Sequence, residues 1–228
     1  MAVRYSDILA SVIHDIKNSM SVINNHIGDI MMMSNLSEDM QQRTNVMYQE
    51  MKRANNQLVQ LLTLYKMDNQ RLTANISENN VYDFIEEILI EEASLAEAQH
   101  IEIEMECDEW LSWYFDQDLV RGVISSTIGN AKRYTKSKIL LSATEEEHFL
   151  VLRVEDDGDG FPKKFIEYHQ QQTDKDVGRA FSEGRTQLGF FFATNIAEIH
   201  ENKGRSGFMK LKNGESLGGG CFELWLPR

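Results

Sequence analysis

The sequence has few cysteines, and they stand in no metal-binding or redox pattern. Cys107 and Cys221 are the only two among 228 residues, and neither has a CxxC partner or a histidine-rich neighbourhood. Their isolation argues against a disulfide framework and gives no indication of a zinc site. We therefore expect a reducing, cytoplasmic setting.

Positive charge and long apolar runs are also scarce. Lys and Arg number 23 against 36 Asp and Glu, which gives a formal net charge of −13. Nucleic acids and anionic membranes are bound by clustered basic residues, so we expect neither as a partner. No apolar run approaches the roughly 18 residues of a membrane span, and the first residues lack the order of a signal peptide. We expect no membrane contact from this chain.

The first 70 residues contain two helical patterns. Apolar residues recur every three or four positions from Tyr5 to Ile30 and again from Met47 to Tyr65, as in helices that pack side by side. Ser37, in the polar stretch 34–39 between them, is a suitable N-cap for the second helix. Two helices alone bury such stripes poorly, so we expect a helical hairpin that forms a homodimeric four-helix bundle. Packing of one hairpin on the rest of the chain is the alternative.

From about residue 71 the pattern changes to alternating strands and helices. This predicts a second domain, residues 71–228, built as an α/β sandwich with a mixed sheet. The polar residues 161–187 suit a mobile lid better than packed structure. The predicted strands cover 72–76, 101–107, 138–143, 149–155, 208–211 and 222–226, and the predicted helices cover 81–98, 117–133 and 188–200.

His14 lies off the apolar stripe of the first helix. Asp15 flanks it, and Asn18 follows one helical turn later. A neutral imidazole is a competent nucleophile, and a neighbouring carboxylate is able to take its proton. From these residues alone, a solvated surface histidine is the plainer interpretation.

The second domain has a glycine-rich segment at the end of a strong strand. Asp156 opens the run DDGDG, in which Gly158 and Gly160 would let the backbone approach a flat ligand closely. A carboxylate there would accept a hydrogen bond from an exocyclic amine. An ordinary polar turn is the plain alternative, and a calcium loop is weakly indicated because the full ligand spacing is absent.

Two helix ends add residues suited to a nucleotide. Asn130 offers a neutral oxygen for Mg²⁺, Arg133 a cation for phosphates and Tyr134 a ring for an adenine edge. Leu188 and Gly189 open a later helix, and a helix N-terminus favours phosphate.

In order and spacing, these segments resemble the catalytic core of two-component sensor histidine kinases. Residues 14–18 are similar to the histidine box of that family, 130–134 to its asparagine box and 156–160 to its first glycine box. Phe181 matches the lid phenylalanine, and 188–190 match part of the second glycine box. The resemblance implies a dimeric hairpin, residues 1–70, that carries the phosphorylated histidine, followed by an ATP-binding domain of the GHKL or Bergerat type.

The resemblance also implies an ATP-dependent protein-histidine kinase. His14 would attack the γ-phosphate of ATP with Asp15 as the base, and Asn18 would orient water for removing phosphate from the partner. Mg²⁺ on Asn130 and the cation of Arg133 would neutralise charge during transfer. Asp156 would select adenine. The remaining nucleotide-binding residues would be Tyr134, Gly158, Gly160, Leu188 and Gly189.

The implied partner is the receiver domain of a response regulator, which accepts the phosphoryl group on an aspartate. A sensor would lie on another protein or on a missing segment. Ser126 and Gln187 depart from the family pattern, and they favour an alternative in which a degenerate ATP-binding half leaves a phosphotransfer or scaffold module. An ATPase that drives conformational work is disfavoured, because its water-activating glutamate would be expected at Ser126.

Overall fold

The computed structural model describes residues 5–31, 36–68, 72–97, 99–171 and 187–228. The chain divides into two compact units, residues 1–72 and 73–228. No helix in the described ranges is both long enough and apolar enough to cross a membrane.

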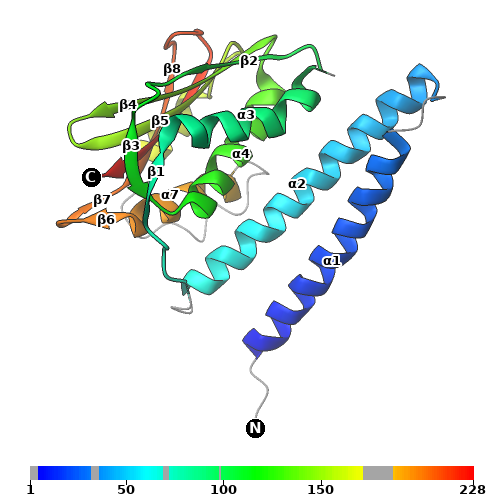
Figure 1. Ribbon diagram of the computed structural model, residues 1–228, viewed down its shortest axis with the longest axis horizontal. Coiled ribbons are helices and arrows are strands. Elements are labelled where there is room, and N and C mark those ends of the chain that lie inside the picture. Colours follow the sequence, from blue (N-terminus) through cyan, green and yellow to red (C-terminus); the bar gives the residue numbers. More distant parts are fainter. Residues whose placement is uncertain (1–4, 32–35, 69–71, 98, 172–186) are drawn as a thin grey trace. The chain divides into compact units, whose positions relative to one another are not determined.

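The first unit is an antiparallel helical hairpin. Helices α1 (Tyr5–Met31) and α2 (Glu38–Asp68) run side by side (Figure 1). Ser37 starts α2 as predicted: its Oγ accepts a hydrogen bond from the Met40 N–H at 3.3 Å, and its carbonyl accepts one from Gln41. Such a cap satisfies N–H groups that the first turn of a helix leaves unpaired.

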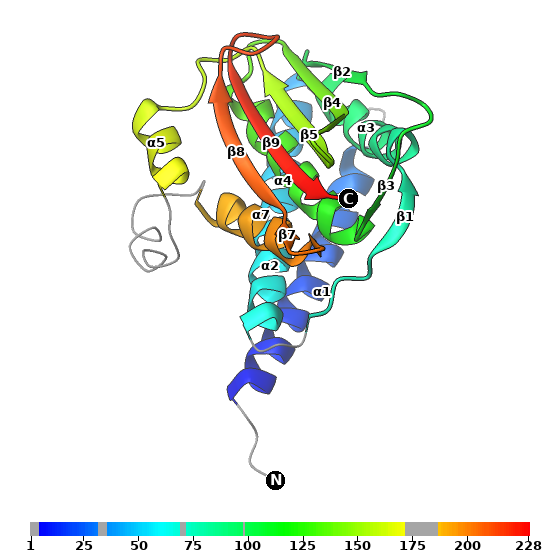
Figure 2. The same ribbon diagram turned by 90° about the vertical axis from the view of Figure 1, so that its left-hand side faces the viewer.

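The second unit is a two-layer α/β sandwich, as the sequence predicts. Its five-stranded sheet has the order β2-β4-β5-β9-β8, and it is mixed because β2 runs parallel to β4 while the other pairs are antiparallel. Figure 2 shows these strands fanned across the unit with α4 and α7 behind them. The sheet strands are β2 (Glu102–Glu106), β4 (Lys138–Glu146), β5 (Phe149–Asp156), β8 (Phe208–Asn213) and β9 (Gly220–Pro227).

Helices cover one face of this sheet. They are α3 (Val81–Glu97), α4 (Gln117–Tyr134) and α7 (Gln187–Ile199), and α5 (Lys163–Gln171) lies beside β8. Ile139 and Leu141 point from β4 into the core between the layers, and Ile124 and Ile128 meet them from α4. Alternate residues of each strand face this core, and the resulting alternation of apolar residues in the sequence made the long strands predictable.

Two short ribbons complete the unit. β1 (Ser77–Asn80) pairs with β3 (Ser112–Phe115), and β6 (Glu201–Asn202) pairs with β7 (Arg205–Ser206). The strand predicted at 72–76 is therefore wrong, since the chain becomes a strand only at Ser77. One reason is local: the Asn75 N–H donates to Asp116 Oδ2 at 2.7 Å, a side chain rather than a neighbouring strand.

The predicted lid, residues 161–187, is only partly described. Its first part contains α5, which the polar composition did not predict. The remainder, including Phe181, lies outside the described residues.

Candidate functional site

Asp156, the last residue of β5, is the centre of the candidate site. Its side chain is buried, with 7% exposed, and Oδ1 accepts hydrogen bonds from the N–H groups of Gly158 at 2.8 Å and Gly220 at 3.2 Å. Its carbonyl accepts a third bond, from Gly219. These bonds fix the carboxylate between the ends of β5 and β9. Oδ2 accepts no hydrogen bond from the described residues, so it is available to a donor on a ligand.

Glycines around Asp156 bring three backbone segments into direct contact. A Cβ on Gly158 would lie 2.1 Å from the carbonyl oxygen of Tyr134, and one on Gly219 would lie 2.3 Å from the carbonyl of Asp156. A Cβ on Gly220 would crowd Asp156 Oδ2 at 2.8 Å. No side chain fits at these positions, because backbone atoms and the Asp156 carboxylate already fill the space.

Asp157 ties the same turn to the loop after α4. Its carboxylate accepts hydrogen bonds from the Thr135 hydroxyl, from the N–H of Lys136 at 2.8 Å and from the N–H and hydroxyl of Ser137. Burial alone would raise the pKa of Asp157, but these hydrogen bonds outweigh it and hold the pKa well below its usual range. No role for Asp157 was predicted from the sequence, although its place directly after Asp156 was a signal.

Asn130, on helix α4, lies beside the first turn of α7. Asp116 caps α4, where its Oδ1 accepts from the Leu119 N–H at 3.0 Å. One turn before the helix ends, Asn130 faces Gly189: a Cβ built on Gly189 would lie 3.8 Å from Asn130 Nδ2 and 3.4 Å from Ser126 Oγ. The structure thus brings together Asn130 and Gly189, which are 59 positions apart in the sequence.

The other predicted ligand-binding residues lie at the end of α4 and in the first turn of α7. Arg133 and Tyr134 are exposed at the end of α4, with 59% of Tyr134 open to solvent. Leu188 stands beside Gly189 in the first turn of α7 and is half-buried. The N–H groups of that turn have no partners within the helix and favour negative charge.

Gly160 and Phe161 lead the chain from the turn toward α5. Gly160 has a φ of +77°, and a Cβ there would also meet the Asn213 side chain at 2.8 Å. The Phe161 N–H donates to Asn213 Oδ1, and Asn213 Nδ2 donates to the Phe161 carbonyl, both at 2.7 Å. Asn213 therefore fixes this segment in the manner of a neighbouring strand. The role of Asn213 was not predicted, because its neighbours in the sequence give no sign that it pairs with Phe161, 52 positions earlier.

The residues present fit a nucleotide with a divalent cation. Asp156 Oδ2, which accepts no hydrogen bond from the described residues, suits a donor on a base, and the α7 N-terminus beside Asn130 suits phosphate. Among the described residues there is no group of three or more His, Cys, Asp and Glu side chains that would hold a metal by itself. A Mg²⁺ ion at Asn130 would thus take most of its oxygen ligands from phosphates and water, as this ion commonly does.

The predicted phosphoacceptor region lies on α1 in the other unit. The backbone of His14 is helical there, and Asp15, Lys17 and Asn18 are exposed. The side chain of His14 lies outside the described part of the structure.

Comparison with known families identifies the second unit. Residues 115–228 match the model of the "Histidine kinase-, DNA gyrase B-, and HSP90-like ATPase" family, and this range holds Asn130, Asp156 and Gly189. The chain belongs to this ATPase family. Within the family it is similar to sensor histidine kinases, as the sequence motifs predicted.

The curated relatives of this ATPase-family chain include sensor kinases. It is 25% identical over 201 residues to the sensor protein SrrB of Staphylococcus aureus strain N315, a match that covers 85% of this chain and 34% of SrrB. SrrB of strain NCTC 8325 is 24% identical over the same length. The chain therefore spans about a third of the length of these relatives.

Solved histidine kinases share the fold. The Acinetobacter baumannii histidine kinase AdeS superposes with a TM-score of 0.58 at 19% identity, over 94% of this chain and 97% of that one. Histidine kinase ThkA, solved in complex with the response regulator protein TrrA, gives 0.59 at 19% identity, over 97% of this chain and 61% of that chain. Full-length ShkA in complex with AMPPNP gives 0.62 at 14% identity, over 96% and 44%.

Proposed function

We propose that this chain is the catalytic part of an ATP-dependent protein-histidine kinase. The observation that carries the proposal is the buried Asp156 carboxylate, in which Gly158 and Gly220 hold Oδ1 while Oδ2 stays available. A carboxylate held in a fixed position, with one oxygen that accepts no hydrogen bond from the described residues, suits the exocyclic amine of adenine. Membership of the ATPase family supports ATP as the nucleotide.

The phosphates would lie toward the ends of α4 and α7. Gly189 leaves open the space beside Asn130, and the first turn of α7, with Leu188, offers N–H groups to phosphate oxygens. Arg133 would add a cation, and the exposed Tyr134 ring would cover an edge of the base. A Mg²⁺ ion held by Asn130 would neutralise phosphate charge during transfer.

The acceptor would be His14 on α1. Its imidazole nitrogen would form a bond to the γ-phosphorus as the bond to the β–γ bridging oxygen breaks and ADP leaves, and the ring proton would pass to Asp15. The phosphoryl group would then move to an aspartate of a response regulator. Asp15 and Asn18 are exposed, so a partner protein has access to this part of α1. In the separate phosphatase reaction, Asn18 would orient a water molecule that removes the phosphoryl group from the partner's aspartate as inorganic phosphate.

The hairpin supports the proposal of a homodimer. α1 leaves Val12, Ile16 and Ile23 more than 40% exposed, and α2 leaves Val46 and Met47 more than 50% exposed. Pairing two hairpins into a four-helix bundle would remove these side chains from water. ThkA, whose solved complex contains the response regulator protein TrrA, supports the proposed class of partner.

The test separates nucleotide binding from phosphoryl transfer. The chain is incubated with γ-labelled ATP and Mg²⁺, and acid-labile label on the protein is measured beside the shift in melting temperature caused by Mg-ATP. We expect His14→Ala to lose the label but keep the shift, and Asp156→Ala to lose both. His26→Ala, which changes another histidine of α1, is the matched control and should keep both.

Other results would point elsewhere. A melting shift without label on the unmodified chain would contradict the kinase. Absence of both would favour the phosphotransfer or scaffold module that Ser126 and Gln187 suggest, and that module should still accept a phosphoryl group on His14 from a second kinase.

A further inference from the structure

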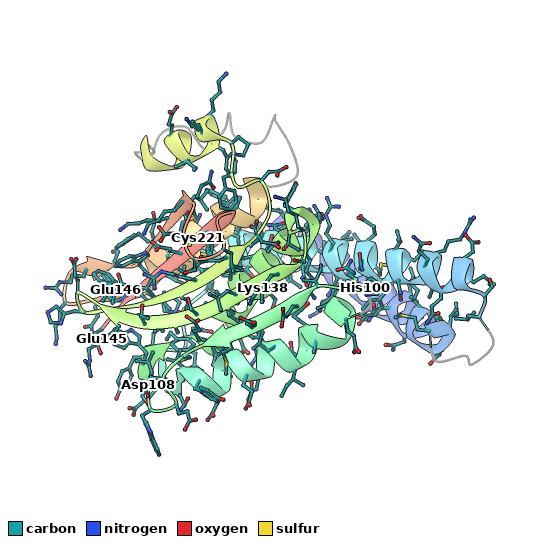
Figure 3. All side chains as sticks on the ribbon, turned by 90° about the horizontal axis from the view of Figure 1, so that it is seen from above. His100, Asp108, Lys138, Glu145, Glu146 and Cys221 are labelled. Carbon is teal, nitrogen blue, oxygen red and sulfur yellow. The ribbon has the colours of Figure 1, made fainter. Side chains whose placement is uncertain are left out.

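A groove lies between α3 and the edge strand β2, which only β4 separates from β5, the strand that ends at Asp156. It has a volume of about 590 Å³. His100, which lines the groove, lies in the turn from α3 to β2, and Figure 3 labels it together with Asp108, which follows β2. The lining of the groove is mainly apolar: Leu89, Ile90, Ala93, Ala96, Glu97, His100, Ile101, Glu102 and Ile103.

The apolar wall of this groove is open to water. Ile90 is 70% exposed, the largest exposed fraction of any aliphatic side chain among the large exposed hydrophobic residues of the described chain. Ile103 and Met105, which point from β2 toward the helix layer, are only half-buried, whereas Ile139 and Leu141 on β4 are fully buried. The helix layer therefore ends short of the sheet edge.

The backbone of β2 is also open on this side. The Glu102 N–H donates to the Ser137 carbonyl on the β4 side at 2.8 Å. Since backbone groups alternate in direction along a strand, those of Ile103 and Met105 point away from β4. In the described chain no strand pairs with β2 along that edge. Such a row of N–H and C=O groups is a template for one more strand.

The other face of β2 is acidic. Glu102, Glu104 and Glu106 alternate with the apolar residues and lie on the face away from the helices. Lys138 pairs with Glu104 at 2.6 Å, while Glu102 and Glu106 pair with no described cation. A strand added at this edge would have one row of side chains in the apolar groove and the other row beside these carboxylates.

We propose that the β2 edge binds an extended protein segment in which apolar and basic residues alternate. The backbone of the segment would pair with Ile103 and Met105, its apolar side chains would enter the groove beside Ile90, and its Lys or Arg residues would face Glu102 and Glu106. When a segment binds as an added strand, its backbone hydrogen bonds supply affinity and its alternate side chains supply specificity.

The proposal does not depend on kinase activity, and a synthetic strand tests it. The probe is a fluorescein-labelled peptide Lys-Val-Lys-Ile-Lys-Val-Lys, and the readout is anisotropy with the full chain. We expect saturable binding that weakens with salt, at least tenfold weaker for Ile90→Glu and for Ile103→Pro. Ile76→Glu makes the same exchange at an exposed isoleucine outside the groove and should bind as the unmodified chain does.

Two further measurements make the test decisive. Exchange of the Ile103 and Met105 amide hydrogens should slow when the peptide binds, and a peptide N-methylated at alternate residues should not bind. Failure of saturable binding, or binding unchanged by Ile90→Glu, would overturn the proposal. The proposal would also be overturned if the unmodified chain self-associates and Ile103→Pro does not, because the β2 edge would then bind a second copy of the chain. If Ile103→Pro lowers the melting temperature, Ile90→Glu, at an exposed site, decides the outcome.

Discussion

At the scale of single residues, His200 is the buried histidine whose protonation state the fold requires. Its Nε2 accepts a hydrogen bond from the Asp116 N–H at 3.0 Å, so the proton lies on Nδ1, which donates to the Ile196 carbonyl at 2.6 Å. Burial lowers the pKa of His200, and the Ile196 carbonyl and Asp116 oppose this only in part. The folded protein therefore holds a neutral imidazole.

This predicts a loss of stability in mild acid. The unfolded chain gains a proton on His200 near pH 6.5, whereas the folded chain gains it only at lower pH. The contribution of neutral His200 to the free energy of unfolding is therefore fully present above pH 6.5 and declines as the pH falls. The difference in free energy of unfolding between the chain and His200→Asn should shrink by up to about 1.4 kcal/mol for each pH unit. Denaturant unfolding at pH 7.5 and 5.5 measures it. The exposed His148→Asn is the matched control, and an equal pH-dependent difference in both variants would contradict a neutral His200 in the folded protein.

At the scale of elements, three strands meet at one buried carboxylate. Glu223 on β9 is fully buried and accepts from Arg153 Nε on β5 at 3.0 Å, from Lys212 Nζ on β8 at 2.9 Å and from Trp225 Nε1 at 2.9 Å. Burial would raise the pKa of Glu223, but these three donors outweigh it and lower the pKa. The charged side chains thus link three adjacent strands on the face away from the helices.

Breaking this link should destabilise the second unit. Arg153→Met leaves Glu223 buried with fewer compensating donors, which costs about 3 kcal/mol in free energy of unfolding. The double variant Arg153→Met with Glu223→Leu should recover part of that loss, because no buried charge remains. Arg228→Met removes an exposed pair with Glu145 and should cost less than about 1 kcal/mol. Urea unfolding of the four proteins gives the comparison, and equal costs for Arg153→Met and Arg228→Met would refute it.

The sequence predicts elements well where one pattern lasts long enough. The helices around Ile124 and Ile196 and the long strands β4 and β5 follow from apolar periodicity, because each buries a whole face. The short strand β3 and the helix α5 were missed. Each is short, and each is held by contacts with distant segments, such as the pairing of Ser77 with Phe115, that local composition does not record.

In the candidate site too, residues in local motifs were predicted and residues that act through distant contacts were not. Asp156, Asn130 and Gly189 were singled out from motifs; the structure places Asn130 beside Gly189 and fixes Asp156 by Gly158, and their role in nucleotide binding stays a prediction. Asp157 and Asn213, which hold the surrounding loops, were not predicted. Their partners are 20 or more residues away, so their role appears only once the chain has folded.

At the scale of the whole molecule, the proposed dimer rests on the exposed stripe of α1. Ile16→Glu would place a carboxylate in the apolar seam of the four-helix bundle, and we expect the dimer dissociation constant to rise at least tenfold. Sedimentation equilibrium measures it. Val22→Glu changes a more exposed apolar residue that lies off the stripe, and it should leave the dimer intact. A dimer that tolerates Ile16→Glu would exclude this interface.

The bare backbone at Gly158 and Gly219 has an evolutionary consequence. A side chain at either position would collide with a carbonyl of the protein itself, so purifying selection acts on these glycines through folding and not through catalysis. A descendant that had stopped using nucleotide would still keep both. Asn130, whose side chain makes no hydrogen bond with the described residues, is under no such constraint from folding. Under the proposed function, the two glycines would persist among related chains whether or not they bind nucleotide, and Asn130 would persist only in those that do.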